Sequence, residues 1–310
     1  MERRNRAWEI WDNSDPADGK RVGEVEEFSE ESYQTLRNVP TKIEMIQSVL
    51  SDHGISLRPN CDLRRFLSEL QSDYEEYEQC FDEDGNIVRQ YRARFPINAC
   101  MLDRIHDSIL AAKGEKSATE ILSHLGKGDV DLLNRSQSKA KDLLWELELF
   151  AILKEKGLRP VFAEPDIVVE FDGAMVGVAC KKLYSETHVQ DVLSKAVRQV
   201  AGEMDVGIAA VNLDELLPAN CIWRSNTLEE AGRKVARHNN GFRTRHSRHI
   251  EKYLASGRLV SVLVSTTALA DIVFGRAKFA NVGDVSYWSL YGLSDEKAQL
   301  LKRFYGMVFG

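Results

Sequence analysis

Residues 159–182 read RPVFAEPDIVVEFDGAMVGVACKK and decide the fold class. Two runs rich in branched apolar side chains, 166–171 and 175–180, flank an Asp-Gly dipeptide at 172–173. This dipeptide is typical of the turn between two antiparallel strands. The stretch therefore predicts a hairpin in which the start of the first strand lies beside the end of the second.

The segments around this hairpin predict helices and further strands. Helical spacing of apolar residues marks the helices, and short continuous apolar runs mark strands buried on both faces. The expected elements are, in chain order, a helix over 138–156 capped by Ser138, a strand over 159–162, the two hairpin strands, a helix over 187–204, a strand over 206–213, a basic helical region over 227–255 and a strand over 259–265. This order predicts an α/β fold with a mixed sheet flanked by helices.

The first 135 residues predict a different kind of structure. Pro40 begins one expected helix, and leucine and phenylalanine residues over 63–70 form an amphipathic stripe. Further helices are expected over 101–112 and 118–125. We therefore divide the chain into a mostly helical, acidic N-terminal domain (1–135), for regulation, partner binding or self-assembly, and an α/β domain (136–310).

Composition excludes several classes of protein. The chain is 43% hydrophobic and 29% charged, as in ordinary globular proteins. It has neither a leader-like start nor the run of about 18 apolar residues that a membrane span needs, so we expect a cytoplasmic protein without a membrane partner. Its five cysteines lack the paired spacing of a structural zinc site or a disulfide framework.

Four polar side chains are expected to meet at one end of the hairpin. Asp166 begins the first strand, Lys181 ends the second, and the flanking helices carry Glu146 and Gln199. Acidic groups and a lysine beside a phosphate can bind a divalent cation and activate water for attack on a phosphodiester. The spacing therefore predicts a hydrolytic site that uses Mg²⁺ or Mn²⁺.

The same stretch resembles the PD-(D/E)xK superfamily of nucleases. Pro165-Asp166 and the string VGVACKK at 176–182 resemble the two halves of the signature, and AVRQ at 196–199 resembles the A-x-x-Q feature of many members. The first helix, with Glu146, resembles that of the resolvases. The resemblance implies a restriction-endonuclease-like fold, a Mg²⁺-dependent DNA endonuclease acting on double-stranded DNA, and a role in antiviral defence.

The resemblance also implies a role for each residue. Asp166 would hold the metal, Glu146 would support the metal shell, and Cys180 would contribute its backbone carbonyl. Lys181 would assist the attacking water, and Gln199 would orient its neighbours or the phosphate.

Position 179 departs from the family pattern. Family members have Glu or Asp there, whereas this chain has Ala179, whose methyl group cannot coordinate a metal. We therefore expect weak or no metal binding and little or no cleavage. Three explanations stay open: an acid removed to trap an inactive enzyme, a naturally degenerate site, or an acid that has migrated to Glu186, Asp191 or Glu203. A non-catalytic module that binds nucleic acid or scaffolds a defence complex is the alternative function.

Each motif residue also has an ordinary structural explanation. Asp166 is a residue type found in turns, Lys181 is one found at solvated strand ends, and Gln199 is one found on helix surfaces. Cys180 is interpreted as a small core residue, and Glu148 as a surface charge.

A basic region follows between residues 224 and 258. It contains nine lysines and arginines against three glutamates, although the chain as a whole carries a net charge of −7. We predict phosphate contacts from Arg233, Lys234, Arg237, Arg243, Arg245, Arg248 and Lys252. The alternative is a solvated face that pairs with the acidic N-terminal region, which would then restrict access to nucleic acid.

Overall fold

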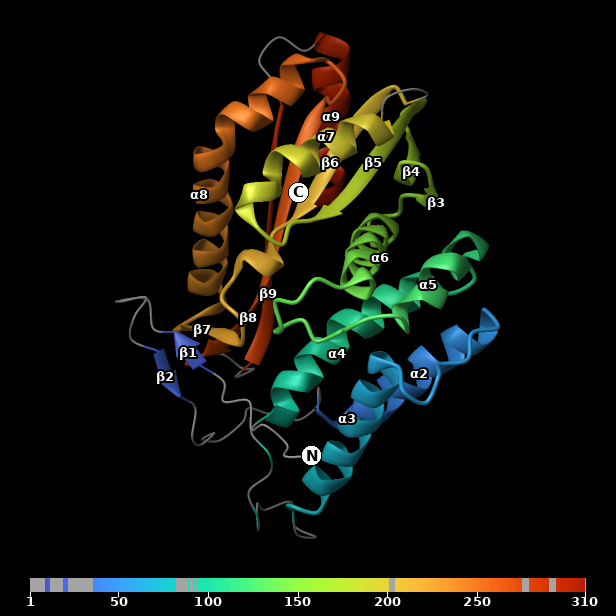
Figure 1. Cartoon of the computed structure of the whole chain (residues 1–310), viewed down its shortest axis with the longest axis vertical. Helices are drawn as coiled ribbons and strands as arrows, with labels where there is room; N and C mark the ends of the chain where they lie inside the picture. The colour runs from blue at the N-terminus through green and yellow to red at the C-terminus, as the bar shows by residue number, and fades with distance from the viewer. Residues whose placement is uncertain are drawn as a thin grey trace.

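One mixed sheet organises the molecule (Figure 1). The computed structural model describes residues 9–11, 19–21, 36–81, 89, 92, 94–200, 204–274, 279–289 and 294–309. Within these residues the sheet has nine strands: eight follow the order β2-β1-β7-β8-β6-β5-β4-β3, and the ninth, β9, pairs with β8. The strands are β1 (Glu9–Trp11), β2 (Gly19–Arg21), β3 (Val161–Ala163), β4 (Asp166–Phe171), β5 (Ala174–Lys182), β6 (Val206–Asn212), β7 (Cys221–Ser225), β8 (Ser261–Ile272) and β9 (Phe279–Trp288). The predicted α/β class with a mixed, helix-flanked sheet is confirmed.

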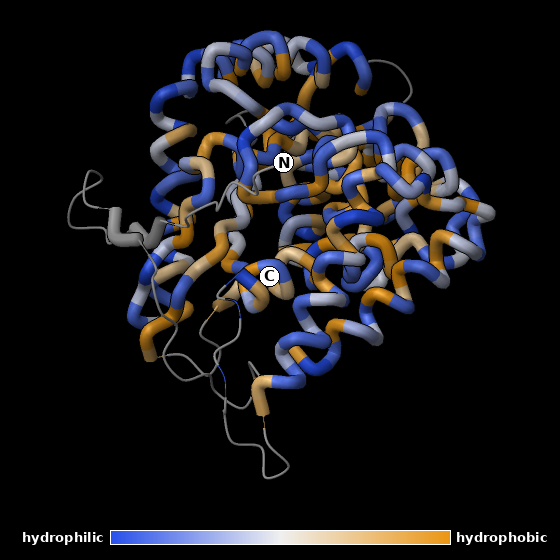
Figure 2. Tube along the Cα trace, turned by 60° about the horizontal axis from the view of Figure 1, so that its bottom comes forward, coloured by the Kyte–Doolittle hydropathy of each residue, from blue (hydrophilic) through white to orange (hydrophobic). Residues whose placement is uncertain are grey.

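Helices cover the sheet and form the N-terminal region. The helices are α2 (Val39–Asp52), α3 (Asp62–Glu78), α4 (Arg94–Ala111), α5 (Thr119–Leu125), α6 (Lys139–Glu155), α7 (Val189–Val200), α8 (Leu228–Ala255) and α9 (Asp295–Phe309), with 3-10 turns η1 (Lys116–Ala118), η2 (Glu186–His188) and η3 (Asp214–Leu216). In Figure 2 hydrophilic and hydrophobic residues alternate along the helical turns, as burial of one helix face requires. Among the described residues, no helix has the length and apolar character needed to cross a membrane.

The predicted hairpin is confirmed as β4 and β5. Asp172 and Gly173 have φ angles of 51° and 78°, the left-handed backbone of a two-residue turn. Strand β5 then pairs in parallel with β6, and β6 pairs in parallel with β8. Helix α7 connects the first parallel pair, so the predicted order of helix, three strands, helix and strand is present.

The two faces of the sheet bury different helices. On one face α6 and α9 pack against alternate strand residues, including Val178 and Cys180. On the other face α7 and α8 pack against a cluster that includes Ala179. Neighbouring residues of β5 therefore point to opposite faces, as expected of a strand.

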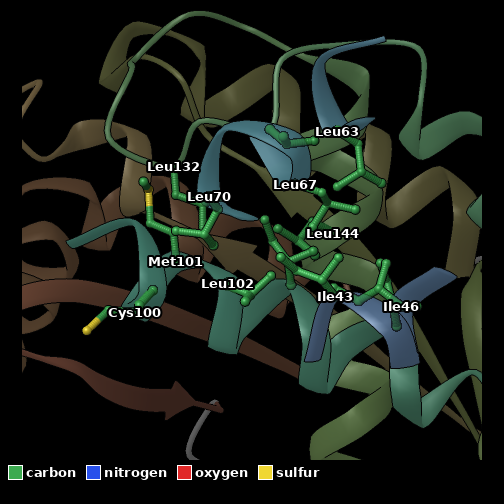
Figure 3. Packing of buried hydrophobic residues seen from close by; sticks show 14 of the residues in the cluster. Ile43, Ile46, Leu63, Leu67, Leu70, Cys100, Met101, Leu102, Leu132 and Leu144 are labelled. Atoms are coloured by element: carbon green, nitrogen blue, oxygen red, sulfur yellow. The ribbon is translucent and has the colours of Figure 1, made fainter. Parts of the chain in front are cut away.

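Helix α6 also belongs to the core of the N-terminal region. Its Leu144 packs with leucine and isoleucine side chains of α2, α3 and α4 (Figure 3), while its Trp145 and Phe150 pack against the sheet. Ser138 precedes the helix as predicted, but its side chain makes no capping hydrogen bond. The apolar core of α2–α5 thus continues across residue 135, and the division of the chain at that residue stays a prediction.

Among the strands and α-helices of the described residues, five were not predicted: β1, β2, β7, β9 and α9. Strands β1 and β2 extend the sheet beside β7, so the N-terminal segment is not wholly helical. Strand β9 pairs with β8 along nearly its whole length.

Candidate active site

Asp166 and Lys181 meet at the end of the β4–β5 hairpin. The Nζ of Lys181 donates to Oδ2 of Asp166 at 2.8 Å, and the backbone N–H of Cys180 donates to the same oxygen at 2.7 Å. Ile167 pairs with Val178, and both belong to the cluster on the α6 face, so Asp166, Ala179 and Lys181 share the α7 face. The convergence predicted from the length of the hairpin is present.

Gln199 reaches the same carboxylate from α7. Its Nε2 donates to the carbonyl of Pro165 at 2.9 Å and lies 3.3 Å from Oδ1 of Asp166. The amide therefore holds the start of β4 and orients Asp166. Its Oε1 is buried and has no hydrogen-bond partner among the described residues, so it stays available to a bound group.

Glu146 completes the group from α6. It lines the same cleft as Asp166, Lys181 and Gln199. Burial, helped by the negative charge of Asp166, raises the pKa of Glu146 to about 7. Near neutral pH this carboxyl group therefore exists in both its protonated and ionised forms.

These four side chains line a cleft with a volume of about 520 Å³. The cleft also includes Lys139, Tyr184, His188 and Lys195, which the sequence interpretation had not singled out. Tyr184 follows Lys181 closely in the sequence, and this closeness was the one indication that any of the four belongs to the site. Lys139, His188 and Lys195 lie at helix starts or on helix faces, which the hairpin pattern does not reveal.

Position 179 contributes a methyl group where the family pattern has a carboxylate. Its side chain is fully buried, in the apolar cluster that also contains Leu193 and Ala196 of α7. Of the three acids considered as migrated replacements, Asp191 lines the cleft and Glu186 is paired with α8, while Glu203 lies outside the described residues.

The residues present do not fit a divalent metal. Mg²⁺ and Mn²⁺ prefer several oxygen ligands in a near-octahedral arrangement. The carbonyl of Cys180 accepts from Lys181 at 2.7 Å, and Asp166 Oδ2 is also bonded to that lysine. Across the described parts of the chain, no group of three or more His, Cys, Asp or Glu residues is arranged to hold a metal. Burial also raises the pKa of the Cys180 thiol, so this thiol is a poor nucleophile.

The basic helix α8 presents only part of its predicted positive charge to solvent. Lys234 is buried. Its Nζ donates to the carbonyl of Arg224 at 2.6 Å and lies 3.3 Å from Glu230, so the buried ammonium has partners within the protein. The predicted phosphate contact from Lys234 is therefore corrected: this lysine lies on the inner face of the helix. Arg233, Arg237, Arg248 and Lys252 are exposed.

Two further arginines of α8 are exposed but already have partners. Arg245 donates to both carboxylate oxygens of Glu186, at 3.0 and 2.6 Å. Arg243 lies over the ring of Trp288, 5.3 Å from its centroid. Within the described residues, the ion pairs of α8 run to its own glutamates and to Glu186, and none joins it to residues 36–135.

A group of buried charges adjoins the cleft, which one of them, Lys182, lines. Arg104 of α4 donates to Glu148 and to Asp214, each at 2.8 Å. Lys182, next to Lys181, donates to Asn212 at 2.9 Å. The side chain of Glu148 is only 13% exposed, so its interpretation as a surface charge was wrong.

The chain matches no protein-family model, no curated protein sequence and no solved structure. The geometry of the cleft is therefore the basis for a functional assignment.

Proposed function

We propose that the cleft is a phosphodiester site of the PD-(D/E)xK nuclease type. In this chain Ala179 takes the place of one acid, so the cleft binds nucleic acid without cutting it. A form with an acidic residue at 179 would be a metal-dependent DNA endonuclease. The observation that supports this proposal most strongly is the contact of Lys181, Gln199 and the Cys180 amide with the single carboxylate of Asp166.

The chemistry of these groups suits a phosphodiester. The ammonium of Lys181 supplies positive charge at the floor of the cleft, where it offsets the charge of a bound phosphate. Gln199 holds Asp166 in position. Glu146, with its pKa near 7, can hold or release a proton beside them. Because the residues present do not fit a metal, we assign no metal-dependent step to this chain. DNA as substrate and a setting in antiviral defence rest on the resemblance alone.

The test of this proposal places an acidic residue at position 179. Ala179→Glu, incubated with plasmid and Mg²⁺ or Mn²⁺, is expected to nick or linearise DNA, because the acid of the family pattern then joins Asp166 and Glu146. Ala179→Gln is the matched control of nearly equal volume without charge. The double variant Ala179→Glu/Lys181→Ala is expected to lose the cleavage.

A folded Ala179→Glu variant that leaves DNA intact would contradict the nuclease proposal. Cleavage that persists without Lys181 would contradict the assigned site. Since position 179 is fully buried among apolar side chains, thermal unfolding of each variant shows whether the larger side chain is tolerated.

The second candidate is a non-catalytic module that binds nucleic acid or scaffolds a complex. The full burial of Ala179 in the apolar cluster beneath α7 favours it, because a carboxylate at that position would be taken out of water. Intact DNA with the folded Ala179→Glu variant, together with DNA binding by the unchanged chain, would support this candidate.

A further inference from the structure

The floor of the cleft is recessed between two helical walls. The side chains of Asp166 and Lys181 are only 16% and 18% exposed. The start of α6, with Lys139, forms one wall, and η2 and α7, with His188 and Lys195, form the other. A phosphate must pass between these walls to reach Lys181.

The volume of the cleft limits the size of the ligand that can enter it. At about 520 Å³ it lies in the size range of pockets that enclose a small ligand, and it has room for about one nucleotide. A double helix, whose major groove alone is about 12 Å wide, is too broad to enter whole, so a nuclease form would cut a plasmid where its strands are locally unpaired. One unpaired strand can enter with one nucleotide at a time.

Tyr184 gives the cleft an aromatic surface that is already fixed in place. Its hydroxyl accepts from the N–H of Ser138 at 3.2 Å and donates toward the carbonyl of Ser138 at 3.0 Å and Oδ1 of Asp142 at 2.9 Å. These bonds tie the ring between the end of β5 and the start of α6. Stacking of an unpaired base on an aromatic ring contributes about 1–3 kcal/mol, and here little side-chain freedom is lost on binding.

The charge of the cleft suits a ligand that brings few phosphates. Four lysines line it, but so do four acids: Asp142, Glu146, Asp166 and Asp191. Lys139 and Lys195 are exposed on opposite walls, and neither forms an ion pair with any described residue. Two or three phosphates of one strand match Lys139, Lys195 and Lys181, whereas duplex binding draws on many more contacts.

We propose that the cleft binds an unpaired nucleic-acid strand, with a base against Tyr184 and the flanking phosphates between Lys139 and Lys195. The proposal rests on the assignment of the cleft as a phosphodiester site. Nothing in the chemistry of these groups separates DNA from RNA, so the experiment contains both.

The test measures binding by fluorescence anisotropy with the unchanged chain of 310 residues. The probes are a short single-stranded DNA, an RNA of the same sequence and the DNA duplex. We expect either strand to bind at least about tenfold more tightly than the duplex. Two or three phosphate contacts predict a slope of log affinity against log salt of about −1.4 to −2.1.

Two variants of Tyr184 locate the binding. Tyr184→Phe keeps the ring and is expected to keep most of the affinity for a strand, whereas Tyr184→Leu is expected to lose about fivefold or more. Thermal unfolding of both variants shows whether the lost hydroxyl bonds alter the fold. Lys195→Gln is expected to reduce the salt slope by about 0.7.

Duplex binding equal to or tighter than strand binding would overturn the proposal, as would equal affinity of the Leu and Phe variants for the strand. The proposed function is tested separately, by the cleavage assay with Ala179→Glu. If Ala179→Glu cuts plasmid while the strand preference is absent, only the strand proposal falls. If no probe binds and no variant cuts, both proposals fall.

Discussion

Replacing Arg104 by methionine tests how strongly the N-terminal helices are joined to the sheet. The guanidinium of Arg104, 12% exposed, is bonded to Glu148, 13% exposed, and Asp214, 4% exposed. Methionine fills similar space but leaves Glu148 without its cation and Asp214 with Lys182 alone, 3.9 Å away. Breaking a buried pair in this way costs about 3–5 kcal/mol. The free energy of unfolding of a whole domain is about 5–15 kcal/mol, so the expected loss is a large part of it.

The assay is urea denaturation at pH 7, followed by circular dichroism. The matched control is Arg233→Met, because Arg233 and its partner Glu229 are 61% and 81% exposed and 3.9 Å apart. An exposed pair of this kind contributes about 0–1 kcal/mol, so the control is expected to change stability little. Asp214→Asn in the Arg104→Met background is expected to recover part of the loss.

The loss of stability in Arg104→Met is expected to depend on pH. Burial alone would raise the pKa of Asp214, but the charges of Arg104 and Lys182 outweigh burial and hold it below its ordinary value. A depressed carboxyl pKa contributes stability above the unfolded pKa of about 3.9, and this contribution is lost as pH falls through the folded pKa. The unchanged chain and Arg104→Met are therefore expected to approach each other in stability below about pH 4. A loss under 1 kcal/mol at pH 7, or one equal to that of Arg233→Met, would refute the reasoning.

Two other substitutions test the electrostatics of the cleft and of α8. The pKa of Glu146 is raised from 4.5 to about 7 by burial, so the folded chain is expected to lose stability as pH rises between these values. Glu146→Gln removes this loss and should be more stable at pH 8 by about 1–3 kcal/mol in urea denaturation, with no gain at pH 4; equal pH profiles would contradict it. Glu186→Gln removes the charge that pairs with Arg245 and one of its two acceptor oxygens, and is expected to raise nucleic-acid affinity at low salt in an anisotropy titration. Glu229→Gln makes the same change in net charge, so an equal rise in both variants would show that Arg245 itself is not used.

The hairpin and its polar end were predictable because local geometry determines them. The turn residues at 172–173 fix the register of β4 and β5, and this register brings Asp166 beside Lys181. No contact between distant segments has to be known for that step. The helices around the hairpin were predictable for the same reason, since the spacing of apolar residues along one segment reveals them.

Strand β9 and the buried charges were not predictable in this way. The sequence of β9, FANVGDVSYW, mixes small, polar and aromatic residues, and its burial depends on β8 and α8. Charged residues are usually exposed, so the burial of Arg104 and Asp214, 110 positions apart, had no sign in either segment. Lys234 was open to prediction, because it lies beside Val235 on the buried face of α8.

Helix α6 has consequences for how the molecule opens and how it can be altered. Leucines on one side of it pack against the N-terminal helices, and its aromatic residues on another side pack against the sheet. Opening one of these interfaces to water also weakens the other, because both are formed by α6. Amide hydrogens of α4 and β5 are therefore expected to exchange in one cooperative event. A chimaera that keeps Glu146 in place must transfer the helices on both sides of α6 together.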